Sequence, residues 1–323
     1  MVRNFIFHRI LPNVGDSKLA IDLNHFEKCI KHISEKYNVI LVEDFENNSF
    51  TPDKQKPVAT LSFDDGYKDN LEYAVPVLEK YNCKGSFYVV SKCVEEQKPI
   101  WIHELEYYFK HTHVTKIDLQ FPFLPDDMKL TALPQQQTRR MGYFQKLKSW
   151  LIKTTPQQRE MVYKFLCDHL NDVEIEPLVM SWADLAQLRA AGHYIGAHSH
   201  THTSLTGIVS NEELKKEFEL PRKLFKEKLG FLPVSFAYPF GFCDNRVKLM
   251  AKDSGYQMAL AAQWHQLYDV NNHDSFEIPR IALSNEPWWK TKMRISNKIE
   301  IIKSVIKYKS TERKTPPSAS PER

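Results

Sequence analysis

Short apolar runs alternate with longer amphipathic segments over most of the chain. Runs rich in β-branched and aromatic residues predict strands, and they lie at Phe5–Phe7, Val39–Val42, Val58–Phe63, Ser86–Val90, Tyr194–Ala197, Val234–Tyr238, Met258–Ala261 and Ile278–Leu283. The amphipathic segments between many of these runs predict helices. Strands that alternate with helices in this way predict an α/β fold with about seven or eight parallel strands, closed or nearly closed into a barrel.

One helix has clear start and stop signals. The segment Asn211–Leu229 is preceded by Ser210, and Glu213 follows three positions later, which is the pattern of a capping box. Gly230 then ends the helix. The residues after Ser181 predict a second helix by the same signal.

The interval from Ile100 to Pro177 breaks the alternation of strands and helices. It is rich in Leu, Gln, Lys and aromatic residues at helical spacing, which predicts a helical insertion after the fourth strand. Because no Gly/Ser-rich linker bounds it, we expect one barrel domain over residues 1–289, with the insertion at about residues 100–177. Residues 290–323 are expected to form a basic amphipathic helix and a disordered tail.

The composition is that of a globular protein, with 42% hydrophobic and 26% charged residues. The net charge of +4 is unevenly spread, because residues 290–323 alone hold ten Lys or Arg and three acidic residues. The rest of the chain is therefore slightly acidic. An acidic body with a basic tail does not indicate a nucleic-acid-binding protein.

Cysteine usage bears on the cellular compartment. The cysteines are odd in number and form no CxxC pair, lying at Cys29, Cys83, Cys93, Cys167 and Cys243. This pattern favours free thiols in a reducing compartment over a disulfide framework.

The first residues lack the apolar stretch of a secretory signal, and no apolar run is long enough to span a membrane. We therefore expect a cytoplasmic protein.

Residues that could carry out chemistry follow four of the predicted strands. In parallel α/β barrels, catalytic groups come from the carboxyl ends of the strands, because the loops there converge on one mouth. The candidates stand at His8, at Asp64-Asp65-Gly66, at His198-Ser199-His200-Thr201-His202 and at Pro239-Phe240-Gly241. The sequence therefore places several polar groups at one end of the predicted barrel.

The acidic and histidine residues have the character of a metal site. Two adjacent carboxylates, Asp64 and Asp65, repel each other unless a cation lies nearby. His198 and His202 are four residues apart, so one turn can present both rings to one ion. Two imidazoles and the carboxylate of Asp65 leave an open position for water, as catalytic divalent-metal sites do. The alternatives are that Asp65-Gly66 is a turn with Asp64 as a helix N-cap, and that the histidines lie in a solvated His-rich loop.

The motifs resemble those of a known family. Ser62-Phe63-Asp64-Asp65-Gly66 resembles the first motif of the polysaccharide deacetylases, the NodB-homology domain of carbohydrate esterase family 4. His198-Ser199-His200-Thr201-His202 resembles the second motif, H-[ST]-x-x-H, and Ala237-Tyr238-Pro239-Phe240-Gly241 occupies the place of the third. The resemblance runs from about residue 2 to residue 284 and leaves the insertion and the tail unexplained.

This resemblance implies a deformed (β/α) barrel and hydrolysis of N-acetyl groups on an amino-sugar polysaccharide or glycan precursor by a metal-bound water. Asp65, His198 and His202 would hold a divalent metal, usually Zn²⁺. Asp64 would be the general base. The metal and the backbone N–H of Phe240 would stabilise the oxyanion.

The sequence departs from the family pattern in two places. Many members have an arginine that orients the catalytic base where this chain has Ala237. We predict that Arg280 approaches the base from a late strand instead, the alternative being a surface arginine that closes the strand.

The second departure concerns the proton donor. The late histidine motif of the family is not evident, but some members are circularly permuted and carry this histidine on the first strand. Phe7-His8-Arg9-Ile10 resembles that arrangement, which makes His8 the predicted general acid. A buried structural role for His8 is the alternative, and His265 and His273 are weaker candidates.

Two other functions remain open from the sequence. A deformylase or an O-acetyl esterase would use the same water and metal. A non-catalytic carbohydrate-binding or assembly protein is favoured by Ala237, whereas the intact acidic and histidine residues oppose it.

The tail carries isoleucines at helical spacing among lysines, after two tryptophans, at Ile295, Ile299, Ile302 and Ile306. A basic amphipathic helix of this kind can lie on an anionic membrane. We therefore predict that residues 291–309 make peripheral contact with the inner face of the membrane. The alternative is that the isoleucines dock on the barrel.

Overall fold

The computed structural model describes residues 2–15, 20–45, 56–176, 178–262 and 274–296. Its central sheet has eight parallel strands. Seven of them follow one another in the order β11 (Met258–Leu260), β10 (Ser235–Ala237), β9 (Tyr194–Ala197), β6 (Ser86–Val89), β5 (Val58–Phe63), β1 (Val2–Phe7) and β12 (Ile281–Ala282). The eighth, β4 (Asn38–Ile40), pairs with the first half of β5.

The two ends of the sheet approach each other. Strand β12 pairs with β1, and Ile278, just before β12, forms a parallel bridge with Leu260 of β11. The segment 278–282 therefore connects β1 with β11, which lie at the two sides of the opening in the barrel. This arrangement confirms the predicted α/β fold, a deformed and nearly closed (β/α) barrel.

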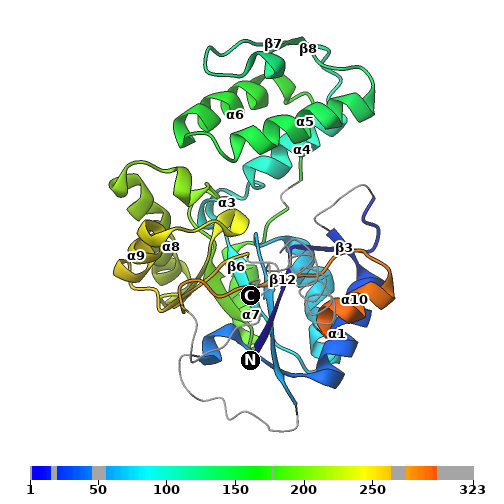
Figure 1. The fold of residues 1–323 in the computed structure, drawn as a ribbon, viewed down its shortest axis with the longest axis vertical. Helices are drawn as coiled ribbons and strands as arrows, with labels where there is room; N and C mark the ends of the chain where they lie inside the picture. The colour runs from blue at the N-terminus through cyan, green and yellow to red at the C-terminus, as the bar shows by residue number, and fades with distance from the viewer. Residues whose placement is uncertain (1, 16–19, 46–55, 177, 263–273, 297–323) are drawn as a thin grey trace, which may run out of the picture.

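Helices surround this sheet (Figure 1). They are α1 (Leu23–Lys36), α2 (Val75–Lys80), α3 (Ser91–Glu96), α7 (Trp182–Ala190), α8 (Asn211–Leu229), α9 (Asn245–Asp253) and α10 (Trp288–Ile295). Shorter elements connect them: β2 (Arg9–Leu11), β3 (Ala20–Asp22), the π-helix Asn70–Ala74, and 3₁₀ turns at Val42–Phe45, Leu205–Gly207 and Pro239–Gly241. Every residue of β1 and β5 is buried, because one face packs on helices and the other lines the barrel.

The predicted ends of these helices are confirmed, but the capping box at Ser210 is only half formed, and the carboxylate of Glu213 accepts hydrogen bonds from Gln157. Helix α8 spans Asn211–Leu229, with the side chain of Ser210 accepting a hydrogen bond from the N–H of Glu213 at 3.3 Å. Gly230 ends it with φ 76°, a conformation that favours glycine. At α7, Ser181 and the third helical residue complete a reciprocal capping box.

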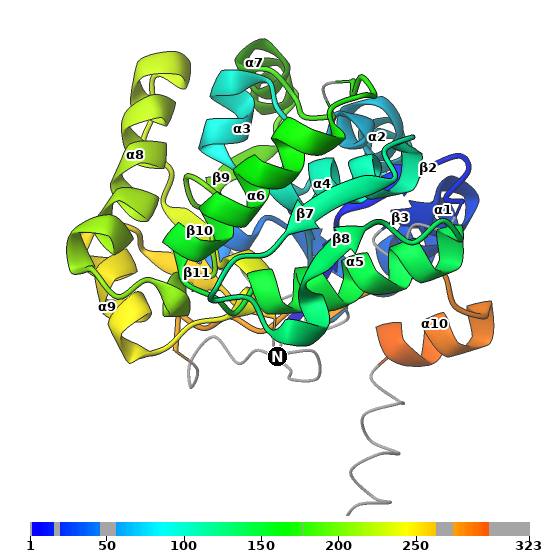
Figure 2. The same cartoon turned by 90° about the horizontal axis from the view of Figure 1, so that it is seen from above.

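The interval after the fourth long strand folds mainly as helices. It contains α4 (Trp101–His111), a hairpin of β7 (Lys116–Leu119) and β8 (Leu130–Ala132), the 3₁₀ turn Asp126–Met128, α5 (Gln137–Leu151) and α6 (Pro156–Leu170). These elements enclose a hydrophobic core of their own around Phe109, Phe144 and Leu166. The two views place the insertion over the carboxyl ends of the barrel strands (Figures 1 and 2).

Helix α10 packs against the barrel. Ile295 is completely buried in the main core, and its carbonyl oxygen accepts a hydrogen bond from the hydroxyl of Tyr37 in α1's C-cap at 2.7 Å. The other isoleucines of the tail, Ile299, Ile302 and Ile306, lie outside the described residues. Within the described ranges, no helix is both long enough and apolar enough to cross a bilayer.

We expect Gly196→Ala to destabilise the barrel by about 1–3 kcal/mol, because an added methyl group would overlap the ring of Tyr88 on the neighbouring strand. Gly142→Ala in α5 is the matched control. Gly142 has open space around it. Because alanine is the better helix former, this substitution should raise the free energy of unfolding by roughly 0.5–1 kcal/mol. Urea unfolding of the two variants measures whether each substitution lowers or raises the free energy of unfolding. Equal effects of the two substitutions would contradict the tight packing between β6 and β9.

Candidate metal-binding active site

Three predicted ligands meet at the carboxyl ends of β5 and β9. The Oδ1 atom of Asp65 lies 3.4 Å from His198 Nε2 and 3.3 Å from His202 Nε2. All three side chains are buried, and their potential ligand atoms lie within 4.8 Å of one another. The geometric requirement for a shared cation is therefore met.

The ring of His198 has a fixed orientation. Its Nδ1 lies 2.7 Å from the carbonyl oxygen of Ala237 at the end of β10. Because that oxygen can only accept, Nδ1 carries a proton, and in the neutral ring Nε2 then presents a lone pair to Asp65. Hydrogen bonds of this kind orient histidines that bind metals.

The chemistry of these atoms fits a cation. Among the residues that the structure describes, the buried Oδ1 of Asp65 has no hydrogen-bond partner, although two imidazole nitrogens lie close to it. A carboxylate oxygen that faces a lone pair of His198 is unfavourable in a buried site unless a positive charge lies between them. Asp65, His198 and His202 could therefore hold a divalent metal, as the sequence predicted.

Strained backbone conformations gather at this site. Six residues other than glycine have positive φ in the described part of the chain, and four of them are Asp65 (78°), Ser199 (64°), His202 (55°) and Phe240 (59°). Each such conformation costs about 1–3 kcal/mol and persists only where the surrounding structure holds it. Strain concentrated in this way is typical of functional sites.

Asp64 is paired with Arg280. The guanidinium donates two hydrogen bonds to the carboxylate, from Nη1 to Oδ1 at 2.7 Å and from Nη2 to Oδ2 at 2.8 Å. Both side chains are almost completely buried. Burial raises the pKa of Asp64, but the charges of Arg280 and His198 and the hydrogen bonds from Arg280 together offset this, so the pKa lies below its ordinary value. Asp64 is thus held ionised, 3.8 Å from His198 Nε2.

The predicted approach of Arg280 from a late strand is present in the structure. The residue immediately precedes β12, and its Nε also bonds the carbonyl oxygen of Ala261 at 3.3 Å. The guanidinium therefore reaches the base from the strand that joins the two ends of the sheet. Ala237 is buried at the end of β10 and contributes its carbonyl oxygen to His198 instead.

All seven residues singled out from the sequence line one cavity of about 240 Å³. They are His8, Asp64, Asp65, His198, His202, Phe240 and Arg280. His8 is half-buried, and the side-chain amide of Asn70 donates to its carbonyl oxygen at 2.8 Å. The ring of Phe240 packs on His202, with 4.7 Å between the ring centroids. The other candidate acids, His265 and His273, lie outside the described residues.

The insertion supplies lining residues that the sequence did not indicate. They are Ile102 and His103 from α4, Lys148 from α5, and Ile152 just after it. His103 Nε2 lies 3.0 Å from the hydroxyl of Tyr67, and burial lowers the pKa of His103 to about 3, so this imidazole is neutral at physiological pH. No local pattern could have placed these residues in the site, because only the fold brings the insertion over the barrel mouth.

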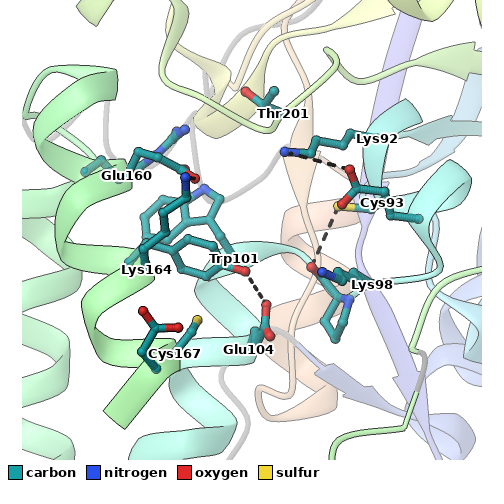
Figure 3. Close-up of a pocket in the computed structure, with 14 residues that line it drawn as sticks. Lys92, Cys93, Lys98, Trp101, Glu104, Glu160, Lys164, Cys167 and Thr201 are labelled. Atoms are coloured by element: carbon teal, nitrogen blue, oxygen red, sulfur yellow. Dashed lines mark hydrogen bonds and ion pairs between the residues drawn. The ribbon is translucent and has the colours of Figure 1, made fainter. Parts of the chain in front are cut away.

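A second pocket of about 340 Å³ lies on the other side of the first turn of α4 (Figure 3). Its walls come from α3, α4 and α6, and include the nearly buried Trp101 and Glu104. Ion pairs at its rim join Lys92 to Glu96 at 3.9 Å and Lys164 to Glu160 at 3.7 Å. None of the predicted catalytic or metal-binding residues lines it.

Comparison with known sequences identifies relatives. The sequence model of the polysaccharide deacetylase family matches residues 51–259, more than half of the chain. Chitin deacetylase 1 of Cryptococcus neoformans is 37% identical over 65 residues, which cover 20% of this chain and 14% of that protein. The Bacillus subtilis protein YxkH is 27% identical over 145 residues, covering 44% of this chain and 49% of YxkH. The chain thus spans half or less of the length of these relatives.

Solved structures share the fold. The deacetylase PplD of Streptococcus pyogenes superposes with a TM-score of 0.59 at 14% identity, covering 93% of this chain and 96% of PplD. IcaB from Ammonifex degensii gives a TM-score of 0.55 at 16% identity, covering 91% of this chain and 96% of IcaB. At these identities the likeness concerns the fold.

We expect Arg280→Met to lower the free energy of unfolding by about 3–5 kcal/mol, because it leaves the buried carboxylate of Asp64 without its cation. Lys164→Met breaks an exposed ion pair with Glu160 and should cost no more than about 1 kcal/mol. Urea denaturation at neutral pH compares the two variants. A loss below about 1 kcal/mol for Arg280→Met would contradict a structural dependence of Asp64 on this arginine.

Proposed function

Because this chain belongs to the polysaccharide deacetylase family, we propose that it hydrolyses N-acetyl groups on an amino-sugar polysaccharide or a glycan precursor. The observation that carries the proposal is the convergence of Asp65, His198 and His202 beside an ionised Asp64. One carboxylate is free to bind a metal while its neighbour is free to accept a proton. A metal ligand next to a proton acceptor suits amide hydrolysis by water.

The three ligands fit a divalent cation, and we propose Zn²⁺, for which two imidazoles and a carboxylate are suitable donors. A bound zinc would polarise the acetamide carbonyl and lower the pKa of water. Asp65 contributes the charge, and His198 is pre-oriented by its bond to Ala237.

The other residues of the cavity have complementary roles in the proposal. Asp64 accepts a proton from the attacking water, and Arg280 keeps it ionised and oriented through two hydrogen bonds. His8, which follows the neighbouring strand β1 at the same end of the barrel, donates a proton to the departing amine. The backbone N–H of Phe240 is the proposed donor to the developing oxyanion. Ala237 favoured a non-catalytic protein because it replaces the arginine that orients the base in many family members. In this proposal Arg280 takes over that role.

The substrate class follows from the family alone. We propose an acetylated amino-sugar glycan, acted on in the cytoplasm. Assays on a panel of acetylated and formylated oligosaccharides, with acetate and formate measured separately, distinguish an N-deacetylase from a deformylase. Release of acetate from O-acetylated sugars only would identify an esterase.

We expect Asp64→Asn to lower acetate release from acetylated amino-sugar oligosaccharides about 10²- to 10⁴-fold, because the amide cannot accept the proton of water. The variant should still bind roughly one zinc per chain, since the three ligands are intact. Metal content is measured by mass spectrometry on the purified protein. His198→Ala is the counterpart, with metal and activity lost together. Undiminished acetate release by Asp64→Asn would show that another group is the base.

The proposal also includes peripheral contact with an anionic membrane through residues 291–309. In α10, Ile295 is buried against the barrel while Trp289 is 63% exposed. Removing residues 297–323 spares Ile295 and should reduce binding to vesicles that contain anionic lipid, because about 1 kcal/mol per basic residue is lost. Sedimentation with the vesicles measures the bound fraction, and Trp289→Ala probes the adjacent ring. Equal binding by the truncated and full-length chains would end the membrane proposal.

A further inference from the structure

The two metal-binding histidines are held in different ways. His198 is oriented by the hydrogen bond from its ring Nδ1 to Ala237. The Nδ1 of His202 is buried and has no hydrogen-bond partner among the described residues. Histidines that bind metals normally gain their orientation from such a bond. Something other than the ring nitrogen must therefore fix His202.

The backbone of His202 is fixed at both of its polar atoms. Its φ of 55° lies in a region that residues other than glycine adopt only where the surroundings impose it. Its N–H donates to the hydroxyl of Ser199 at 3.0 Å. Its carbonyl oxygen accepts a buried hydrogen bond from Trp101 Nε1, also at 3.0 Å. Trp101 is the first residue of α4 and so belongs to the insertion.

Trp101 is itself held by a second helix of the insertion. The guanidinium of Arg159, in α6, lies over the indole at 5.3 Å from the ring centroid. Arg159 also donates to the hydroxyl of Thr203, the residue after His202, at 2.5 Å. Both Trp101 and Arg159 are more than nine-tenths buried. Figure 3 views Trp101 from the neighbouring pocket, below the loop that carries Thr201.

We propose that Trp101, supported by Arg159, is a positioning residue for the metal ligand His202. The insertion thereby helps to set the metal affinity of the site, in addition to lining the cavity. This role rests on the proposed function, because it requires that a metal binds there. A carbonyl oxygen held by a rigid indole fixes the strained peptide of His202, and with it the direction in which the ring points.

The test uses Trp101→Phe in the full-length protein, which keeps an aromatic ring and removes the N–H donor. Co²⁺ serves as the probe, with affinity measured by chelator competition and geometry by its visible absorption spectrum. We expect the Co²⁺ affinity to fall about 10- to 100-fold and the absorption bands to shift. The thermal unfolding midpoint of the metal-free variant should fall by no more than about 10 °C, because a single buried carbonyl loses its donor.

Trp150→Phe is the matched control, since Trp150 lies in α5 of the same insertion and stacks on Phe123 with 6.2 Å between the ring centroids. It should leave Co²⁺ affinity and spectrum unchanged. Arg159→Lys keeps the charge but loses the planar group over the indole, so it should reduce affinity in the same direction by a smaller factor.

Co²⁺ affinities within twofold of wild type for both Trp101→Phe and Arg159→Lys would overturn the inference. A loss of affinity matched by Trp150→Phe would also overturn it, because the effect would then be general to the insertion. Failure of the proposed function looks different. In that case the wild-type protein would bind no Co²⁺ at the site, and His198→Ala would change nothing.

Discussion

The structure of this site depends on one buried carboxylate oxygen that faces two imidazoles. Asp65 Oδ1 lies within 3.4 Å of both rings, yet no hydrogen bond from the described part of the chain satisfies it. In a medium of low polarity such an arrangement is stabilised by a positive charge, which a divalent cation between the three side chains would supply. The barrel makes the arrangement possible, because β5 and β9 are parallel, separated only by β6, and end at the same mouth. Asp65 and His202 both have positive φ angles at this mouth.

Adjacent aspartates acquire different properties from different neighbours. Asp64 lies against Arg280, whose fixed charge and two hydrogen bonds, together with the nearby His198, hold its pKa below the ordinary value in spite of burial. Among the described residues, Asp65 has no arginine partner, and its carboxylate faces His198 and His202. One dipeptide can therefore supply both a proton acceptor and a metal ligand. The guanidinium comes from the segment that closes the sheet, so the closure of the barrel and the charge state of the base are linked.

Much of this could be read from the sequence. The strand Val58–Phe63 and the helix Asn211–Leu229 have the predicted bounds, since apolar runs and capping signals act locally. The seven candidate residues share one cavity, because strand ends converge in a parallel barrel. The β7–β8 hairpin was missed, since it lies among helical patterns. The contacts of Ile102, His103 and Trp101 with the site were missed as well. They depend on how the insertion packs on the barrel, which no periodicity encodes.

The central claim is most directly tested by anomalous diffraction at the zinc absorption edge, from crystals grown with Zn²⁺. The account predicts one strong peak at about 2.0–2.2 Å from Asp65 Oδ1, His198 Nε2 and His202 Nε2. A peak elsewhere, or density with no anomalous signal between these three side chains, would contradict it.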